Sequence, residues 1–167
     1  TLLYSSNVSG EYEPCGWKSN QLGGLSGKAH LLKKLNDDQQ PLILVDAGNL
    51  LFKTALTVGA ATNDTTSLII AHGLVRAYKA MSYDAVAVSA DDLSAGLDFF
   101  QQTKNASFPW IAANVYDKNA NLLFPPHVIK RIETMTVGII GLTGKNVQSV
   151  AGFIIGDWRD SLRKEIS

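Results

Sequence analysis

The stretch LILVDAGN, residues 42–49, decides the fold. Four consecutive apolar residues lead into an acidic residue and a glycine turn, as in strands that are buried on both faces of a parallel sheet. Three other segments have similar apolar runs and predict further strands: residues 2–6, DAVAVSADD at 84–92 and FPWIAANVYD at 108–117.

Segments with helical spacing of their apolar residues separate these strands. The pattern predicts helices over residues 22–36, 66–81, 96–104 and 157–166, the last with Asp157 as its N-cap. Residues 127–142 alternate in polarity on either side of Glu133–Thr134, which predicts an antiparallel hairpin.

Alternation of strands and helices predicts an α/β fold with a mostly parallel sheet, flanked by helices and followed by the hairpin. We expect a single α/β domain over residues 1–167. Functional groups in such sheets gather on loops at the carboxyl ends of the strands. The expected loops are 5–10, 46–49, 89–92 and 114–117.

Composition narrows the functional classes. The chain has 167 residues, of which 46% are hydrophobic and 18% charged, and its formal net charge is zero. A balanced charge gives no general attraction to nucleic acid or to an anionic membrane. No apolar run approaches the roughly 20 residues that a membrane-spanning helix needs. The single cysteine, Cys15, excludes an internal disulfide.

Six segments, in order along the chain, carry a family resemblance. They read LLYSSNVSG (2–10), GGLSGKAHLL (23–32), LVDAGNLL (44–51), YDAVAVSADDLSAGLDFF (83–100), FPWIAANVYDKNANLLF (108–124) and TVGIIGLTG (136–144). The chain resembles the N-terminal metallophosphoesterase domain of the secreted 5′-nucleotidase and UDP-sugar hydrolase family. The resemblance implies a calcineurin-like half domain, and a family chemistry in which two divalent metals activate a water.

The positions that match the family's metal ligands hold different residues here. Asn7 and Ser9 stand where the family has an Asp-x-His pair, and Asn49 stands where it has a bridging Asp. Ala90 and Asp91 stand where it has an Asn-His pair. Neutral amides and a hydroxyl cannot balance the charge of two clustered dications, so the resemblance implies a degenerate metal site and no catalytic residues.

We therefore expect no cofactor. The alternative is one weakly bound divalent ion at Asp46, Asp91 and Asp92, since carboxylates suit Mg²⁺ and Ca²⁺. Against it, Asp46 is readily interpreted as a strand-end residue and the pair Asp91–Asp92 as a cap of the following helix.

The segment EPCGWKSNQLGG, residues 13–24, resembles a bacterial subgroup with a Cys-Gly-Cys or selenocysteine loop, with Trp17 at the second redox position. Lys18 would favour a reactive thiolate at Cys15. The cysteine is either inert or a thiol site formed by Cys15, Trp17 and Lys18 that pairs with a partner chain.

The sequence thus predicts a pseudoenzyme of the metallophosphoesterase family that acts in binding or self-assembly, with a protein partner, homo-oligomer or filament. The resemblance to a secreted family implies an extracytoplasmic location, periplasmic or extracellular, after removal of a signal peptide. The alternatives are a metal-dependent 5′-nucleotidase or phosphoesterase fragment and a thiol-based redox or binding module.

Overall fold

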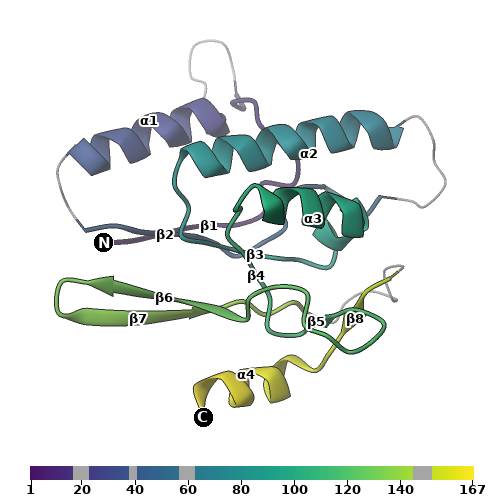
Figure 1. The fold of residues 1–167 in the computed structure, drawn as a ribbon. Helices are drawn as coiled ribbons and strands as arrows, with labels where there is room; N and C mark the ends of the chain where they lie inside the picture. Colours follow the sequence, from purple (N-terminus) through teal and green to yellow (C-terminus); the bar gives the residue numbers. More distant parts are fainter. Residues whose placement is uncertain (17–22, 38–40, 57–62, 145–151) are drawn as a thin grey trace.

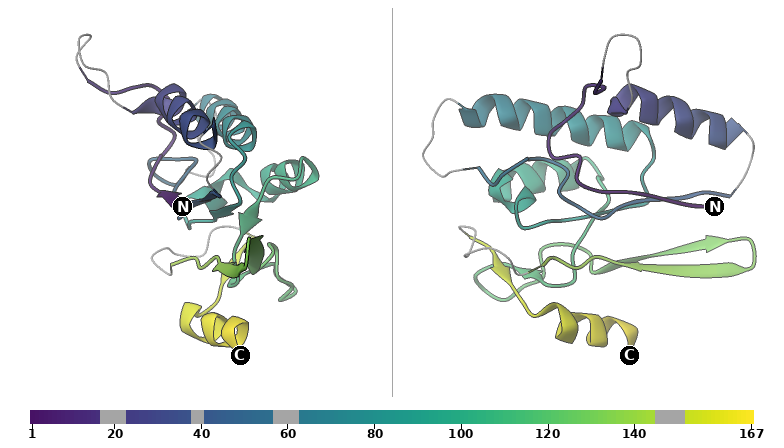
Figure 2. Two further views of the ribbon diagram at one scale, coloured as in Figure 1. Left: turned by 90° about the vertical axis from the view of Figure 1, so that its left-hand side faces the viewer. Right: turned by 180° about the vertical axis from the view of Figure 1, so that it is seen from behind.

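The computed structural model describes residues 1–16, 23–37, 41–56, 63–144 and 152–167. A parallel four-stranded sheet of order β1-β2-β3-β4 lies between two layers (Figures 1 and 2). The strands are β1 (Leu2–Ser5), β2 (Ile43–Asp46), β3 (Ala85–Ala87) and β4 (Trp110–Ile111). All three strand pairs are parallel, which confirms the α/β fold class expected from the apolar runs.

Three helices cover one face of this sheet (Figure 1). They are α1 (Gly24–Asp37), α2 (Asn63–Ala80) and α3 (Leu97–Asn105), each close to its predicted bounds. A 3₁₀ turn at Asp92–Ala95 precedes α3. Apolar side chains of α2 and β3 fill the space between helices and sheet, and Leu74, Tyr78 and Val86 are at most 1% exposed.

The second layer lies on the other side of the sheet and ends in α4 (Trp158–Ile166) (Figure 2). Strands β6 (His127–Ile132) and β7 (Met135–Ile140) form the predicted antiparallel hairpin. The Asp157 carboxylate accepts hydrogen bonds from the backbone N–H groups of Arg159 and Asp160, which confirms the predicted N-cap of α4.

One strand prediction is wrong. Residues 108–117 form two short strands in different sheets, because β5 (Val115–Tyr116) pairs antiparallel with β8 (Ile154–Ile155). The chain leaves the parallel sheet at Ala112, whose N–H donates to Pro125 O, and at Ala113, whose N–H donates to Gly141 O. An apolar run shows that a segment is buried, but it does not show which strand the segment pairs with.

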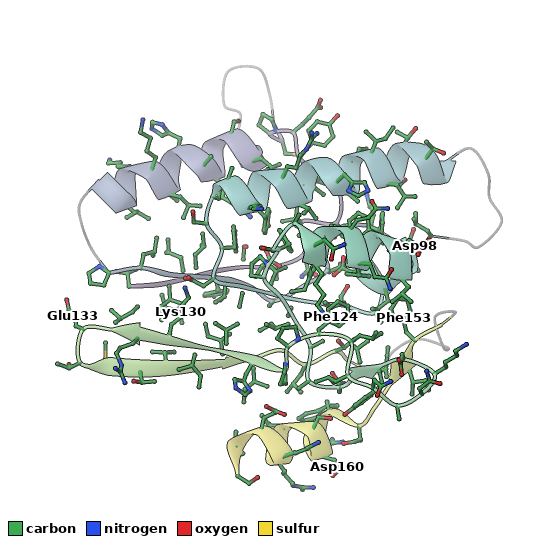
Figure 3. The ribbon with its side chains drawn as sticks, viewed as in Figure 1. Asp98, Phe124, Lys130, Glu133, Phe153 and Asp160 are labelled. Carbon is green, nitrogen blue, oxygen red and sulfur yellow. The ribbon has the colours of Figure 1, made fainter. Side chains whose placement is uncertain are left out.

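An aromatic cluster joins the two layers. Phe100 of α3 makes edge-to-face contacts with Trp110, Phe124 and Phe153, at centroid distances of 5.3, 5.1 and 6.2 Å. Phe124 and Phe153 come from the second layer and point toward the sheet and α3 (Figure 3). Because aromatic pairs of this geometry add to the free energy of burial, the cluster holds the layers together.

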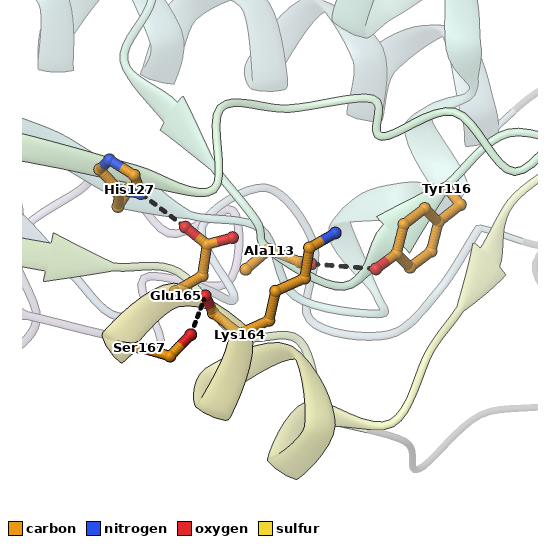
Figure 4. Close-up of polar contacts among 6 residues, drawn as sticks. All are labelled: Ala113, Tyr116, His127, Lys164, Glu165 and Ser167. Atoms are coloured by element: carbon orange, nitrogen blue, oxygen red, sulfur yellow. Dashed lines mark hydrogen bonds and ion pairs between the residues drawn. The ribbon is translucent and has the colours of Figure 1, made fainter.

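Two ion pairs fasten the second layer: the first joins it to the parallel sheet, and the second joins β6 to α4 within the layer. Lys130 of β6 lies 2.6 Å from Asp84, which precedes β3, and His127 Nδ1 lies 2.6 Å from Glu165 Oε2 of α4 (Figures 3 and 4). The Lys130 and His127 side chains are 41% and 40% exposed. None of the helices in the described ranges has the length and apolar character needed to cross a membrane.

Candidate functional site

Three of the four expected loops meet at the carboxyl ends of the parallel strands. Backbone hydrogen bonds join the first loop to the second, from Asn7 N to Gly48 O at 3.0 Å and from Ser9 N to Asn49 O at 2.8 Å. The Asn49 N–H also reaches the third loop and donates to Asp92 Oδ2 at 3.1 Å. The expected fourth loop, residues 114–117, contributes strand β5 instead, so that part of the prediction is wrong.

Asn49 lies at the centre of this loop cluster. Its Nδ2 donates to Asn7 Oδ1 at 3.2 Å and to Ser9 Oγ at 3.1 Å. Its Oδ1 is buried and has no hydrogen-bond partner among the described residues. Three of the residues at positions that resemble the family's ligands are therefore in mutual contact, and the contacts are bonds between neutral groups.

The same three residues share an unusual backbone conformation. Asn7, Ser9 and Asn49 have φ values of 55°, 53° and 58°. Non-glycine residues enter this left-handed region infrequently, and asparagine enters it several times more often than most other residues. The turn conformation, rather than side-chain packing alone, sets the direction in which these side chains project.

Asp92 fastens the second loop to the third. Its carboxylate is fully buried and accepts bonds from the backbone N–H groups of Asn49, Leu51 and Ser89 and from the Ser89 hydroxyl. Burial raises the pKa of the Asp92 carboxyl, and the bonds from Leu51 and Ser89 oppose that rise. With four donors on two oxygens, Asp92 organises the loops internally.

The residues that precede Asp92 do not hold the loops together. Asp91 occupies the N-cap position of the 3₁₀ turn but makes no side-chain capping bond, and Ala90 is half-buried beside it. The interpretation of Asp91 and Asp92 as side-chain caps of the following helix is therefore wrong. The buried acid tethers the loops instead, because loop N–H groups converge on it.

Asp46, at the end of β2, is held by a second set of donors. Its Oδ2 accepts from the Ser5 hydroxyl at 2.5 Å and from the Tyr78 hydroxyl at 3.0 Å, and its Oδ1 accepts from Gly48 N at 2.9 Å. The carboxylate is 2% exposed. These bonds are consistent with a structural role for this strand-end residue.

Tyr78 connects Asp46 to helix α1. The Lys28 ammonium donates to the Tyr78 hydroxyl at 2.8 Å and lies 4.8 Å from the centre of its ring. Tyr78 also stacks on Tyr83 with a centroid distance of 4.2 Å. Burial, followed by the negative charge of Asp46, raises the pKa of Tyr78 well above its usual range, so the phenol stays protonated.

The acids predicted as a weak metal site do not come together as a ligand group. Among the described residues, no set of three or more His, Cys, Asp or Glu side chains is arranged to hold a metal ion. The oxygens of Asp46 and Asp92 already accept bonds from the protein, and Asp91 lies beside them without sharing those bonds.

The predicted thiol site is only partly described. Cys15 is an exposed free cysteine. Trp17 and Lys18 lie outside the described residues, so the proposed effect of Lys18 on the thiol stays a prediction.

Several organising residues escaped the sequence analysis. Ser5, Tyr78 and Ser89 each bond a loop carboxylate. Ser5 and Ser89 lie in predicted loops but were not singled out, and Tyr78 fits equally well in the apolar stripe of α2. Asn114 is fully buried and bonds both the N–H and the carbonyl of Thr143. A buried asparagine within an apolar run is the one sequence signal that marks such a tether.

No protein-family model matches the chain. The chain is 31% identical over 110 residues to the trifunctional nucleotide phosphoesterase protein YfkN of Bacillus subtilis, covering 64% of this chain and 8% of that protein. It is 25% identical to a 5′-nucleotidase of Vibrio cholerae over an alignment of 177 positions, covering all of this chain and 30% of that protein. The chain thus spans less than a third of the length of the curated relatives it matches.

Solved structures share the fold. The NAD nucleotidase of Haemophilus influenzae superposes with a TM-score of 0.75 at 17% identity, over 98% of this chain and 30% of that one. The calcineurin-like phosphoesterase YfkN of Bacillus subtilis superposes with a TM-score of 0.69 at 25% identity, over 99% and 56%. This chain is related to the 5′-nucleotidases and YfkN, and it has the fold of the N-terminal part of a calcineurin-like phosphoesterase domain.

Proposed function

We propose that this chain is a degenerate member of the metallophosphoesterase group that acts by binding or self-assembly outside the cytoplasm, without two-metal hydrolysis. The observation that carries the proposal is the neutral cluster at the loop ends. Asn49 donates to both Asn7 and Ser9, so the positions that resemble metal ligands converge and bond to one another.

The chemistry of the available metal ligands supports this proposal. A pair of divalent cations needs anionic oxygens, above all a carboxylate that bridges both ions, and imidazole or carboxylate ligands around them. Asn49 offers an amide at the position that resembles the bridge, and Asn7 and Ser9 add no charge. The nearby carboxylates Asp46 and Asp92 are buried and bonded to protein donors. This set of residues does not fit a two-metal centre.

The names of the relatives describe nucleotide phosphoesterases and 5′-nucleotidases, and these proteins are several times longer than this chain. For this chain to act as a hydrolase, the loop cluster would need anionic side chains as metal ligands. The location outside the cytoplasm rests on the family resemblance, and fractionation of cells that express the full gene tests it.

The test of the proposed function is the metal content of the purified protein. The protein is loaded with Mn²⁺ or Zn²⁺, desalted, and measured by elemental analysis. We expect a content near zero per chain. About two tightly held ions per chain would overturn the proposal, and release of phosphate from nucleotides by that sample would confirm the hydrolase alternative.

A pair of variants sharpens this measurement. The double substitution Asn7→Asp and Asn49→Asp restores negative charge at the loop cluster, and we expect more Mn²⁺ to be retained than by the wild type. Gln102→Glu and Asn105→Asp make the same charge change on the exposed side of α3, away from the loop cluster. Equal retention by the two variants would show that the loop cluster is not a former ligand set.

A further inference from the structure

Strand β7 leaves one edge of the hairpin layer without a partner strand. Among the described strands it pairs with β6 alone, in a register that sets Ile132 opposite Met135 across the turn. Residues that flank a two-residue turn exchange backbone bonds, and the next pair along the strands does not. Thr136, Gly138 and Ile140 therefore direct their N–H and C=O groups away from β6, toward the open edge.

This edge lacks the features that keep sheet edges from pairing. β7 reads MTVGII and contains no charged residue and no proline. Thr136 and Gly138 are exposed, and a Cβ placed on Gly138 would meet no described atom within 4 Å beyond its chain neighbours. The turn end of the hairpin also projects past α4 (Figures 1 and 2). An uncharged, largely apolar edge of six residues is a template for another strand.

The other described strand edges are less suited to pairing. Arg131 is exposed at an outward position of β6, and a charged side chain on an edge opposes the addition of a strand. Strand β1 has four residues, and β4, β5 and β8 have two each, so they offer few backbone groups. Within the described part of the chain, β7 is therefore the edge that best accepts a strand.

We propose that two copies of this chain pair through β7, antiparallel and about a two-fold axis at Gly138. This register sets Thr136 of each copy opposite Ile140 of the other, so the outward N–H and C=O groups of both strands bond across the axis. On the other face of the sheet, Val137 of each copy lies opposite Ile139 of the other. The pair forms a four-stranded sheet with the two β6 strands outermost, which closes the assembly as a dimer.

A second copy suits this edge because β7 complements itself. Both strands are uncharged, so equivalent side chains meet without repulsion. The opposed pairs, Thr136 with Ile140 and Val137 with Ile139, consist of β-branched residues, which favour sheets. The formal net charge of zero adds no long-range repulsion between copies. This inference rests on the self-assembly role proposed above and names the surface that carries it.

Sedimentation equilibrium of the full 167-residue chain tests the pairing. We expect a species of twice the 18.0 kDa chain mass that dissociates on dilution. Gly138→Pro removes the outward N–H at the axis and keeps the bonds between β6 and β7, so it should weaken dimerisation about tenfold or more. Ile129→Pro is the matched control. Ile129 lies opposite Gly138 with its N–H at the other edge of the hairpin, so this variant should dimerise like the wild type.

A second pair of variants tests the two-fold axis without proline. Gly138→Lys and Gly138→Glu each bring like charges together at the axis, and each variant alone should dimerise about fivefold more weakly than the wild type. A mixture of the two should recover the wild-type affinity, because opposite charges then meet. Circular dichroism checks that all four variants keep the wild-type secondary structure.

Four results would overturn the inference: a chain that stays monomeric at its highest soluble concentration, dimers that survive Gly138→Pro, an equal loss in Ile129→Pro, or a mixture of the charged variants that pairs no better than either alone. The metal measurement is independent of these outcomes. Two bound ions with an intact dimer would remove the proposed function alone, whereas a metal-free monomer would remove the inference alone.

Discussion

The loop cluster and the hairpin layer both use carboxylates to join separate segments, but they use them in different surroundings. Asp92 is fully buried and accepts bonds from four donors, whereas the Glu165 side chain is 15% exposed and meets one partner, His127, which is 40% exposed. Removing the partner of a buried donor costs far more free energy than breaking an exposed pair, because the groups of an exposed pair can bond to water instead. Burial, rather than the number of ion pairs, therefore determines which region controls stability.

The largest expected effect comes from Asp92→Asn. The amide has one acceptor oxygen instead of two, so backbone N–H groups that now bond to Asp92 lose their partner. We expect the free energy of unfolding to fall by about 3 kcal/mol. Asp91→Asn is the matched control, because Asp91 makes no side-chain capping bond and its change should cost under about 0.5 kcal/mol. Urea denaturation of both variants measures the difference, and equal losses would contradict the proposed tether.

The next effect is expected at Tyr78. Tyr78→Phe removes the hydroxyl between Asp46 and Lys28, and we expect a loss of about 2 kcal/mol near pH 7. The loss should shrink in alkali. Burial raises the pKa of Tyr78 in the folded protein above the value of about 10 that tyrosine has in the unfolded chain. The contribution of this group to stability is therefore complete below pH 10 and is lost as the pH rises further.

Denaturation of the wild type and of Tyr78→Phe between pH 7 and pH 11 measures how the difference in their free energies of unfolding shrinks. Above pH 10 the wild type should lose about 1.4 kcal/mol per pH unit through this group, while Tyr78→Phe should not. The exposed Tyr12 supplies a control, since Tyr12→Phe should keep the wild-type pH dependence. A constant difference between wild type and Tyr78→Phe across this range would contradict the assignment.

The smallest expected effect belongs to the hairpin layer. Glu165→Gln weakens the contact with His127, and we expect a change in the free energy of unfolding below about 0.5 kcal/mol. Hydrogen exchange in residues 158–166 should still become faster, because few other side chains of α4 are buried. Glu133→Gln at the hairpin tip is the control (Figure 3). A loss as large as that of Asp92→Asn would remove the contrast between the two regions.

The sequence could predict the elements and loops that repeat a local pattern. The run at residues 42–49 forms β2 and its glycine turn, and the turn at Glu133–Thr134 does close a hairpin. These features depend on neighbouring residues alone. The three loops of the candidate site could also be predicted, because the carboxyl ends of neighbouring parallel strands lie at one edge of the sheet.

The sequence could not predict contacts that depend on partners far away in the chain. The division of residues 108–117 into β4 and β5 depends on bonds to Pro125 and Gly141. The role of Asp92 depends on N–H groups more than 40 residues earlier, at Asn49 and Leu51. No local pattern distinguishes Asp92 from Asp91, although one is a buried tether and the other is a half-buried neighbour.

The left-handed backbone at Asn7 and Asn49 has a consequence for how such a site changes over time. Aspartate and asparagine both tolerate this conformation, and their side chains have nearly the same shape. An exchange between them alters the charge of the loop cluster while the turns keep their geometry. Single substitutions at Asn7 or Asn49 can therefore change the charge of this loop cluster without requiring a different fold.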